Sequence, residues 1–290
     1  EKTLAYFTDL ETPNRFSEAN SLKLLAEINI NRGDEAQGQQ QLLKALAILD
    51  EQQEQSNPSD ETQLLRSNLY YWLGLIAYQK NDFATVLARW QQYLQAAEQL
   101  LAVEPNKKQW KIEVSSAQHN LGALALRMED FPAAASHFAA SAVIERQILN
   151  DEPSSVEAKR ALRGTLLWQS DVELNRWNIA AAKSLAAEAI ALALSYVETE
   201  PANFGYKFEL LSAYNVLINY QLLSKDWAAL SHSFQQAMPL AHLLSMRDLG
   251  NASWNIRVAT LLAHYFDYLL LGPAVEPEFL TMAQIGRAHV

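Results

Sequence analysis

Apolar residues recur every three or four positions along most of this chain, which is the pattern of an α-helix with one buried face. The clearest apolar stripe covers residues 83–101, and a similar one covers residues 131–148. Two further stripes begin at Trp177 and Trp227. The aromatic residues that open these four stripes are 48, 46 and 50 residues apart. The sequence therefore predicts an amphipathic helix that recurs along the chain.

A second set of helical stripes alternates with this one and is visible over residues 65–76 and 114–128. Within each unit we call this earlier helix the first helix and the one after the turn the second helix. The turn is short, as at residues 80–82, so the two helices must lie antiparallel. Polar residues that can cap the second helices precede the stripes at Asp82, Asp130, Asn175 and Asp226.

Prolines mark the boundaries between the units. Pro105, Pro153 and Pro201 follow one another at intervals of 48 residues, and each is preceded by glutamate. Pro58 and Pro13 continue the series upstream at similar spacings. A residue before proline is disfavoured in a helix, so each proline ends a unit. Self-similarity at such a period predicts a solenoid, which offers an extended binding surface more often than a catalytic pocket.

These boundaries predict an all-α chain of five helix pairs with partial units at both ends. The first dozen residues parallel the end of a later second helix, so we expect a truncated preceding repeat there. Residues 285–290 match no repeat position, and we expect them to be a non-native tail. The predicted division is 1–13 tail of a preceding repeat, 14–57 repeat 1, 58–104 repeat 2, 105–152 repeat 3, 153–200 repeat 4, 201–249 repeat 5, 250–284 partial repeat 6 and 285–290 non-native tail.

At the level of motifs the chain resembles the tetratricopeptide repeat (TPR) family over about residues 14–284. Leucine and glycine stand together in two first helices, at 73–74 and 121–122, and aspartate precedes phenylalanine at two turns, at 82–83 and 130–131. Small residues of the second helix match at Ala134 and Ala180, and its later aromatic residue matches at Trp90, Phe138 and Phe234. The resemblance implies a right-handed α-solenoid of antiparallel helix pairs, a TPR-like superhelix.

Three features depart from the usual pattern of that family. The repeat is 46 to 50 residues long, against about 34 in the common form. Long repeats of this kind are similar to those appended to bacterial signalling proteins such as Ser/Thr kinases and winged-helix regulators. Trp168 and Ile218 stand where a small residue is expected, which predicts either wider helix pairs there or a slip of the assigned register. Pro239 is expected to kink or end its helix. HEAT-like pairs are the alternative architecture, because their period is closer.

The resemblance also implies a binding face on the concave side, lined by the first helices. This face would be mixed polar with a few aromatic residues, as suits an extended peptide, and Tyr71 and Tyr78 lie off the apolar stripe of their helix. It lacks the grouped basic and amide residues with which some relatives clamp a terminal carboxylate. Carried over by position, the candidate partner-binding residues are Lys23, Glu27, Asn68, Tyr71, Leu75, Tyr78, Ser116, His119, Ala123, Arg127, Thr165, Gln169, Asn215 and Asn219.

Composition and the absence of known motifs argue against several other functions. The net charge is −10 and no basic stripe is visible, so nucleic acid is not an expected partner. There is no cysteine, which excludes disulfides and thiolate chemistry. No uninterrupted apolar run reaches the roughly 18–20 residues that would span a bilayer. The histidines are not paired at helical metal-site spacing and no catalytic motif occurs, so we expect no enzyme activity, cofactor or metal.

The function predicted from the sequence is a non-catalytic protein–protein interaction scaffold that binds a peptide or protein on its concave face. The alternative is a regulatory or sensor arm of a larger bacterial signalling protein, a kinase or a transcriptional regulator. Self-association through truncated ends is a further expectation. For the compartment we expect the cytoplasm, with an extracytoplasmic repeat domain of a membrane protein as the alternative.

Overall fold

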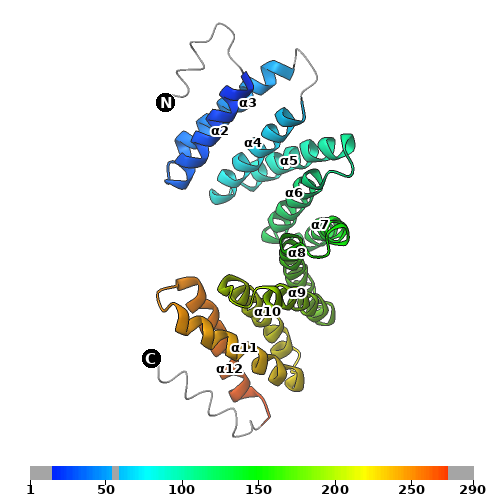
Figure 1. The fold of residues 1–290 in the computed structure, drawn as a ribbon, viewed down its shortest axis with the longest axis vertical. Helices are drawn as coiled ribbons and strands as arrows, with labels where there is room; N and C mark the ends of the chain where they lie inside the picture. The colour runs from blue at the N-terminus through cyan, green and yellow to red at the C-terminus, as the bar shows by residue number, and fades with distance from the viewer. Residues whose placement is uncertain (1–14, 54–58, 274–290) are drawn as a thin grey trace. The chain divides into compact units, whose positions relative to one another are not determined.

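The computed structural model describes residues 15–53 and 59–273, and these form eleven α-helices and no strand (Figure 1). The first helices are α2 (Arg15–Asn31), α4 (Asp60–Gln79), α6 (Lys108–Arg127), α8 (Val156–Asn175), α10 (Phe204–Leu223) and α12 (Ala252–Leu271). The second helices are α3 (Glu35–Gln53), α5 (Phe83–Val103), α7 (Phe131–Asp151), α9 (Ile179–Thr199) and α11 (Trp227–Arg247). The predicted all-α class is confirmed, and the predicted tails at 1–13 and 285–290 lie outside the described residues.

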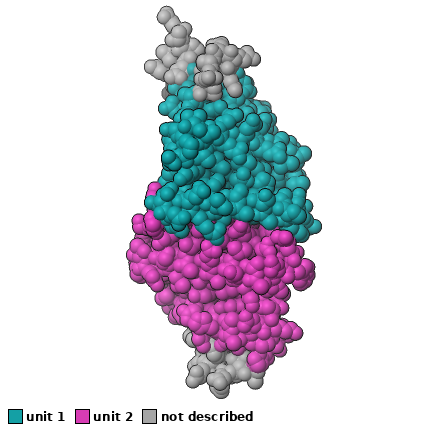
Figure 2. Space-filling view, turned by 90° about the vertical axis from the view of Figure 1, so that its right-hand side faces the viewer, with its two compact units in different colours: residues 1–151 teal, residues 152–290 magenta. Residues whose placement is uncertain are grey.

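The chain divides into two compact units, residues 1–151 with helices α2 to α7 and residues 152–290 with helices α8 to α12 (Figure 2). In unit 1, α2 packs on α3, α4 on α5 and α6 on α7. In unit 2, α8 packs on α9 and α10 on α11. Each pair also contacts the next pair of its unit, through α3 and α4, α5 and α6, α9 and α10, and α11 and α12. This is the α-solenoid arrangement of helix pairs, while the handedness of the superhelix stays a prediction.

The helices keep a constant register of 48 residues. The first helices from α4 onward begin at residues 60, 108, 156, 204 and 252, and the second helices begin at residues 35, 83, 131, 179 and 227. The turn between the paired helices holds one residue of positive φ at the same interval, at Gly33, Asn81, Glu129, Trp177 and Lys225. A positive φ is the left-handed region, so each chain reversal uses the same backbone geometry.

This register corrects the prediction for the fourth second helix. Trp177 does not open an apolar stripe; it lies in the turn with φ 59° and 83% of its surface exposed. The helix begins at Ile179, and Asn178 caps it by accepting a hydrogen bond from the Ala181 amide at 3.4 Å. Asn175, the predicted cap, is instead the last residue of α8. The apparent spacings of 46 and 50 residues came from this misplaced aromatic residue.

Two glycines allow paired helices to approach closely. A methyl group on Gly74 of α4 would overlap the indole of Trp90 in α5, whose Nε1 donates a hydrogen bond to the Tyr71 carbonyl at 3.3 Å. A methyl group on Gly122 would lie 2.9 Å from the ring of Phe138. The large residue of the second helix therefore fills the space that the missing side chain leaves.

The same position in α8 belongs to Ser170, so the prediction that placed Trp168 there was wrong by two residues. Ser170 is fully buried, and its hydroxyl lies 3.0 Å from that of Tyr220 in α10. The next equivalent is Ile218, which is also fully buried. In α11, Pro239 does not end the helix, which continues to Arg247.

By length and composition, α9 could cross a membrane. Its sequence contains three charged residues, Lys183, Glu188 and Glu198. Inside unit 2 it packs on both α8 and α10. The side that faces the core is made of small residues and one tyrosine, namely Ala182, Ala186, Ala189, Ala193 and Tyr196, with Ile190 beside them.

An ion cluster joins three helices of unit 2 around Glu209 of α10. Arg160 of α8 donates through Nε to Glu209 Oε1 at 3.0 Å and through a second nitrogen to the same carboxylate. Arg163 lies 3.4 Å from Glu209 Oε2, and the Tyr196 hydroxyl of α9 donates to Oε2 at 2.8 Å. Burial alone would raise the pKa of Glu209, but these hydrogen bonds and positive charges outweigh it and lower the pKa.

We expect Glu209→Gln to lower the free energy of unfolding by about 1–2 kcal/mol at pH 7, because the cluster is half-exposed and partly screened. The folded pKa lies below the unfolded value of 4.5, so the stabilisation is present above pH 4.5 and is lost as the pH falls through the folded pKa. Urea unfolding at pH 7 and at pH 3 should therefore show a gap between wild type and variant that narrows on acidification. Glu198→Gln, at an exposed position of α9, is the matched control, and a gap of equal size at both pH values would contradict the assignment.

Candidate binding face on the first helices

An aromatic and basic cluster lies where the α4–α5 pair meets α6 in unit 1. The ring of Tyr78 stacks on Trp90, with centroids 5.6 Å apart and planes inclined by 24°. The guanidinium of Arg127, the last residue of α6, lies over Tyr78 at 5.0 Å and over Phe83 at 5.6 Å. Its Nη2 donates to Asn81 Oδ1 at 2.6 Å. These contacts fix an arginine of one hairpin against the aromatic surface of the preceding hairpin.

The charge of Arg127 faces solvent without a carboxylate to neutralise it. The side chain is exposed, and its hydrogen-bond acceptor, Asn81, is a neutral amide. Among the described residues no ion pair involves Arg127. A guanidinium held beside a flat aromatic ring can bind an acidic group while the ring contacts an apolar neighbour.

Tyr71, two turns earlier on α4, is tied more closely to the core. Its ring meets Tyr93 edge-on, with centroids 6.0 Å apart. The Tyr93 hydroxyl donates to Glu113 Oε2 at 2.8 Å. Burial raises the pKa of Glu113, and burial together with the Glu113 charge raises the pKa of Tyr93. Tyr71 is therefore a half-buried wall of this face.

The remaining candidates of unit 1 are half-buried. Asn68 donates to the carbonyl of Leu64 at 2.8 Å, so part of its hydrogen-bonding capacity is used within its own helix. The ring of His119 meets Phe138 edge-on at 5.3 Å. Burial lowers the pKa of His119, which keeps the imidazole neutral at pH 7. Leu75, Ser116 and Ala123 lie between these residues on α4 and α6. In α2, Lys23 and Glu27 pair with each other at 2.7 Å.

Unit 2 does not continue this face as predicted. Thr165 and Asn215 are buried, with 1% and 3% of their surfaces exposed, so a docking partner cannot reach them. Asn215 instead donates to the carbonyl of Arg257 in α12 at 2.9 Å. In the 48-residue register, the position of Asn68 and Ser116 falls on Gly164 and not on Thr165. Gln169 and Asn219 are half-buried.

No family model matches the chain, and no curated protein matches it in sequence. Several solved structures match it over more than four fifths of both chains. BtubC (BKLC) from P. vanneervenii is 11% identical, with a TM-score of 0.64 and coverage of 84% of this chain and 89% of its own. The nuclear import adaptor Nro1 of S. pombe is 11% identical, with a TM-score of 0.56 and coverage of 94% and 98%.

A third matching structure is itself built of repeats. It contains the nearly identical TPR-like repeats of a predicted kinesin light chain from Podosopora anserina, with 16% identity, a TM-score of 0.51 and coverage of 82% of this chain and 100% of that one. The chain has the tetratricopeptide repeat fold. At these identities the likeness concerns the fold alone, and it agrees with the small and large residue pairs at Gly74 and Trp90 and at Gly122 and Phe138.

Reasoning from the TPR motifs missed the residues that support Arg127. Asn81 and Phe83 belong to the preceding turn and helix, so their contact with α6 becomes visible only once neighbouring TPR hairpins are stacked. A fixed spacing of 48 residues between the turns would have placed Asn81 and Trp177 at equivalent turn positions, where both have a positive φ. Within the described part of the chain, no group of three or more potential metal ligands comes together.

Proposed function

We propose that this protein is a non-catalytic scaffold that binds a peptide or protein segment on the first-helix face of unit 1. By this face we mean the side of α4 and α6 that carries Asn68, Tyr71, Leu75, Tyr78, Ser116, His119, Ala123 and Arg127. The observation that carries the proposal is the fixed, solvent-facing charge of Arg127 over the ring of Tyr78. The TPR fold supports it, because stacked helix pairs present extended surfaces to their partners.

The chemistry of the face selects an acidic segment with an aromatic or aliphatic neighbour. Arg127 supplies the charge, and the half-buried Tyr78 ring, which stacks on Trp90, supplies an apolar edge beside it. Half-buried positions such as Ala123 and Leu75 leave a shallow surface that an extended peptide can follow. The binding residues are already held by ring stacking and hydrogen bonds, so little ordering entropy is lost on binding.

We expect peptides selected for binding from a random displayed library to be enriched in Asp or Glu next to an aromatic or aliphatic residue. Arg127→Gln should weaken these peptides at least tenfold, and wild-type binding should weaken as salt is raised. Fluorescence anisotropy with the selected peptides measures both effects. Arg176→Gln is the matched control, because Arg176 is an exposed arginine of unit 2 paired with Glu173. Selected peptides that bind Arg127→Gln and wild type equally would remove this face from the proposal.

A second candidate is a regulatory or sensor arm of a larger bacterial signalling protein. The constant 48-residue repeat favours it, because repeats longer than the common form resemble those appended to signalling kinases and winged-helix regulators. In that case the first-helix face would bind a partner or a segment of the same polypeptide. Sequencing the gene on both sides of this coding region tests the candidate. A kinase or winged-helix coding sequence in the same reading frame supports it. A start codon directly upstream together with a stop codon directly downstream removes it.

A further inference from the structure

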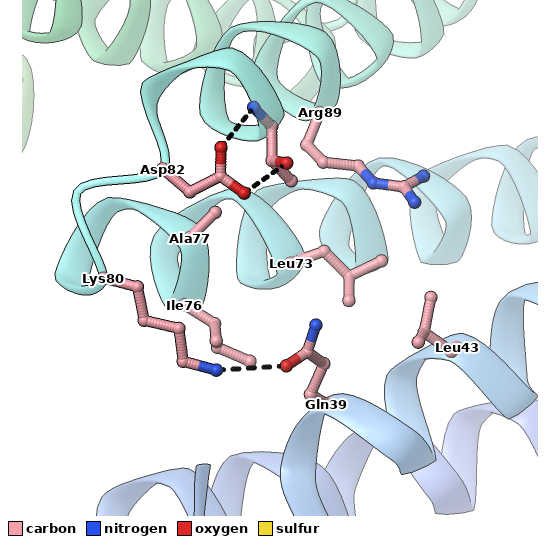
Figure 3. A pocket seen from close by; sticks show the side chains of 9 residues that line it. Gln39, Leu43, Leu73, Ile76, Ala77, Lys80, Asp82 and Arg89 are labelled. Carbon is pink, nitrogen blue, oxygen red and sulfur yellow. Dashed lines mark hydrogen bonds between the residues drawn. The ribbon is translucent and has the colours of Figure 1, made fainter. Parts of the chain in front are cut away.

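A hollow of about 190 Å³ lies within unit 1 between α3 and α5, and the second half of α4 forms its floor (Figure 3). We call it the α3–α5 hollow. Its aliphatic wall consists of Leu43 from α3 with Leu73 and Ile76 from α4. Leu73 and Ile76 are buried, whereas 42% of the Leu43 surface is exposed. Leu43 is therefore the aliphatic residue of this wall that a ligand can reach.

Two cations, Lys80 and Arg89, line the polar side of the hollow. Lys80 Nζ donates to Gln39 Oε1 at 3.1 Å, as the dashed line in Figure 3 marks, and Arg89 Nη1 donates to Gln92 Oε1 at 3.1 Å. Both acceptors are neutral amides, and neither cation has an ion pair among the residues that the structure describes. A guanidinium can bind a carboxylate through two parallel hydrogen bonds, so the hollow has free capacity for an acid.

The carboxylate in the lining, Asp82, is committed to another contact. It caps α5 by accepting hydrogen bonds from the Thr85 amide at 3.2 Å and from Thr85 Oγ1 at 2.6 Å. These two bonds also lower the pKa of Asp82, so it stays ionised and attached to Thr85 at neutral pH. The lining thus holds two cations against one anion that is already bonded.

Unit 2 contains the equivalent position between α9 and α11, 144 residues further along the chain. There Lys183 replaces Gln39, and its Nζ pairs with the capping carboxylate of Asp226 at 2.9 Å. The position of Arg89 is taken by the buried Ser233. In unit 2 the lysine at this position is therefore neutralised by an internal ion pair. In unit 1 the acceptors of Lys80 and Arg89 are neutral amides.

Figure 3 shows the Lys80 ammonium and the Arg89 guanidinium at opposite ends of the hollow, with Leu43 on the side of Arg89. We propose that the α3–α5 hollow binds an aliphatic carboxylate, with the acid group on Arg89 and the hydrocarbon part against Leu43. The volume is smaller than the roughly 300–1,000 Å³ of sites for drug-sized ligands. The ligand is therefore a small free acid or the last residue of a peptide chain. None of the lining residues belongs to the first-helix face, so this site goes beyond the proposed scaffold function.

The direct test is a titration of the full chain, with labelled leucine and isoleucine methyl groups, followed by NMR. With 4-methylpentanoate we expect saturable shifts of the methyl signals of Leu43, Leu73 and Ile76, and with 4-methylpentanamide at least tenfold weaker binding. Arg89→Gln should weaken the acid at least tenfold. Lys183→Gln, at the paired lysine of unit 2, is the control and should leave the affinity unchanged. Equal binding of acid and amide, or no saturable shift with the acid, overturns the proposal.

Two further arms identify the source of the acid and guard against a misfolded variant. The affinity of Ala-Ala-Leu with a free C-terminus is compared with that of its C-terminal amide and with that of 4-methylpentanoate. Whichever of the peptide and 4-methylpentanoate binds more tightly indicates the source of the acid. Leu43→Glu places a carboxylate on the Arg89 side of the hollow at a partly exposed position, so it should abolish acid binding and raise the thermal midpoint. A lower midpoint with unchanged acid binding contradicts the proposal. Because Arg127 is intact in these variants, peptide capture by the first-helix face remains a separate result.

Discussion

Replacing Gly74 with alanine is expected to lower the free energy of unfolding of unit 1 by about 2 kcal/mol. The added methyl group would overlap the indole of Trp90, which is buried and held by a stack on Tyr78 and a hydrogen bond to the Tyr71 carbonyl. A large ring fixed on two sides cannot move away without loss of packing. The strain therefore exceeds the roughly 1 kcal/mol that alanine gains over glycine inside a helix.

The chain supplies a matched control in Gly164 of α8, where an added methyl group would meet no heavy atom within 4 Å apart from its chain neighbours and the backbone of its own helix. Gly164→Ala should raise stability by up to about 1 kcal/mol through helix propensity alone. Urea unfolding followed by circular dichroism measures both variants. In a Trp90→Ala background the cost of Gly74→Ala should disappear. If Gly74→Ala and Gly164→Ala shift the midpoint in the same direction, the close approach of α4 and α5 is not as described.

Removing the hydroxyl of Tyr220 is the second change with a large expected effect. The Tyr220 side chain is buried in unit 2, and its hydroxyl donates to Asp171 Oδ1 at 2.7 Å. Tyr220→Phe leaves the half-buried Asp171 carboxylate without this donor, which should cost about 1.5–3 kcal/mol at pH 7. Tyr214→Phe is the control, because the Tyr214 hydroxyl has no hydrogen bond to any described residue.

The pH dependence of Tyr220→Phe has a definite sign. Burial raises the pKa of Asp171 above its ordinary value of 3.8, although the Tyr220 hydrogen bond opposes this shift. Loss of the bond should raise the pKa further. The folded variant then binds a proton more tightly than its unfolded chain, so its stability falls as the pH rises from 3.8 through the folded pKa. Unfolding at pH 4 and pH 7 should show a smaller penalty at pH 4, and a penalty independent of pH would contradict the pairing.

The repeat and its helix pairs were predictable because they depend on local patterns. Apolar periodicity, turn residues and the glycines at 74 and 122 all act within one hairpin. The same reasoning failed at Trp177, because an apolar pattern treats a large aromatic residue as core and does not reveal a residue of positive φ in a turn. Assigning every residue by the fixed register, and not by hydrophobicity, would have avoided this error.

The candidate face was predicted less well because it depends on contacts between hairpins. Arg127 was selected by position, but its place over Tyr78 requires α6 to pack on the preceding pair. Tyr220 and Ser170 are 50 residues apart and meet only when α8 and α10 come together. Asn215 was expected on the binding face from its position in the resemblance to the TPR family, yet α12 covers it and accepts its hydrogen bond. One amphipathic helix carries no information on which of its polar side chains the neighbouring hairpin will cover.

The constant start of the hairpins from α4 onward has a consequence for how such a gene changes. Unequal crossing-over between any two of these modules rejoins the backbone at the same point of the hairpin, so no turn is cut and no helix changes length. The array can gain or lose whole hairpins in a single genetic event. What such an event alters is which neighbours meet, and therefore which surface contacts, such as that of Arg127 with the preceding turn, are inherited or lost.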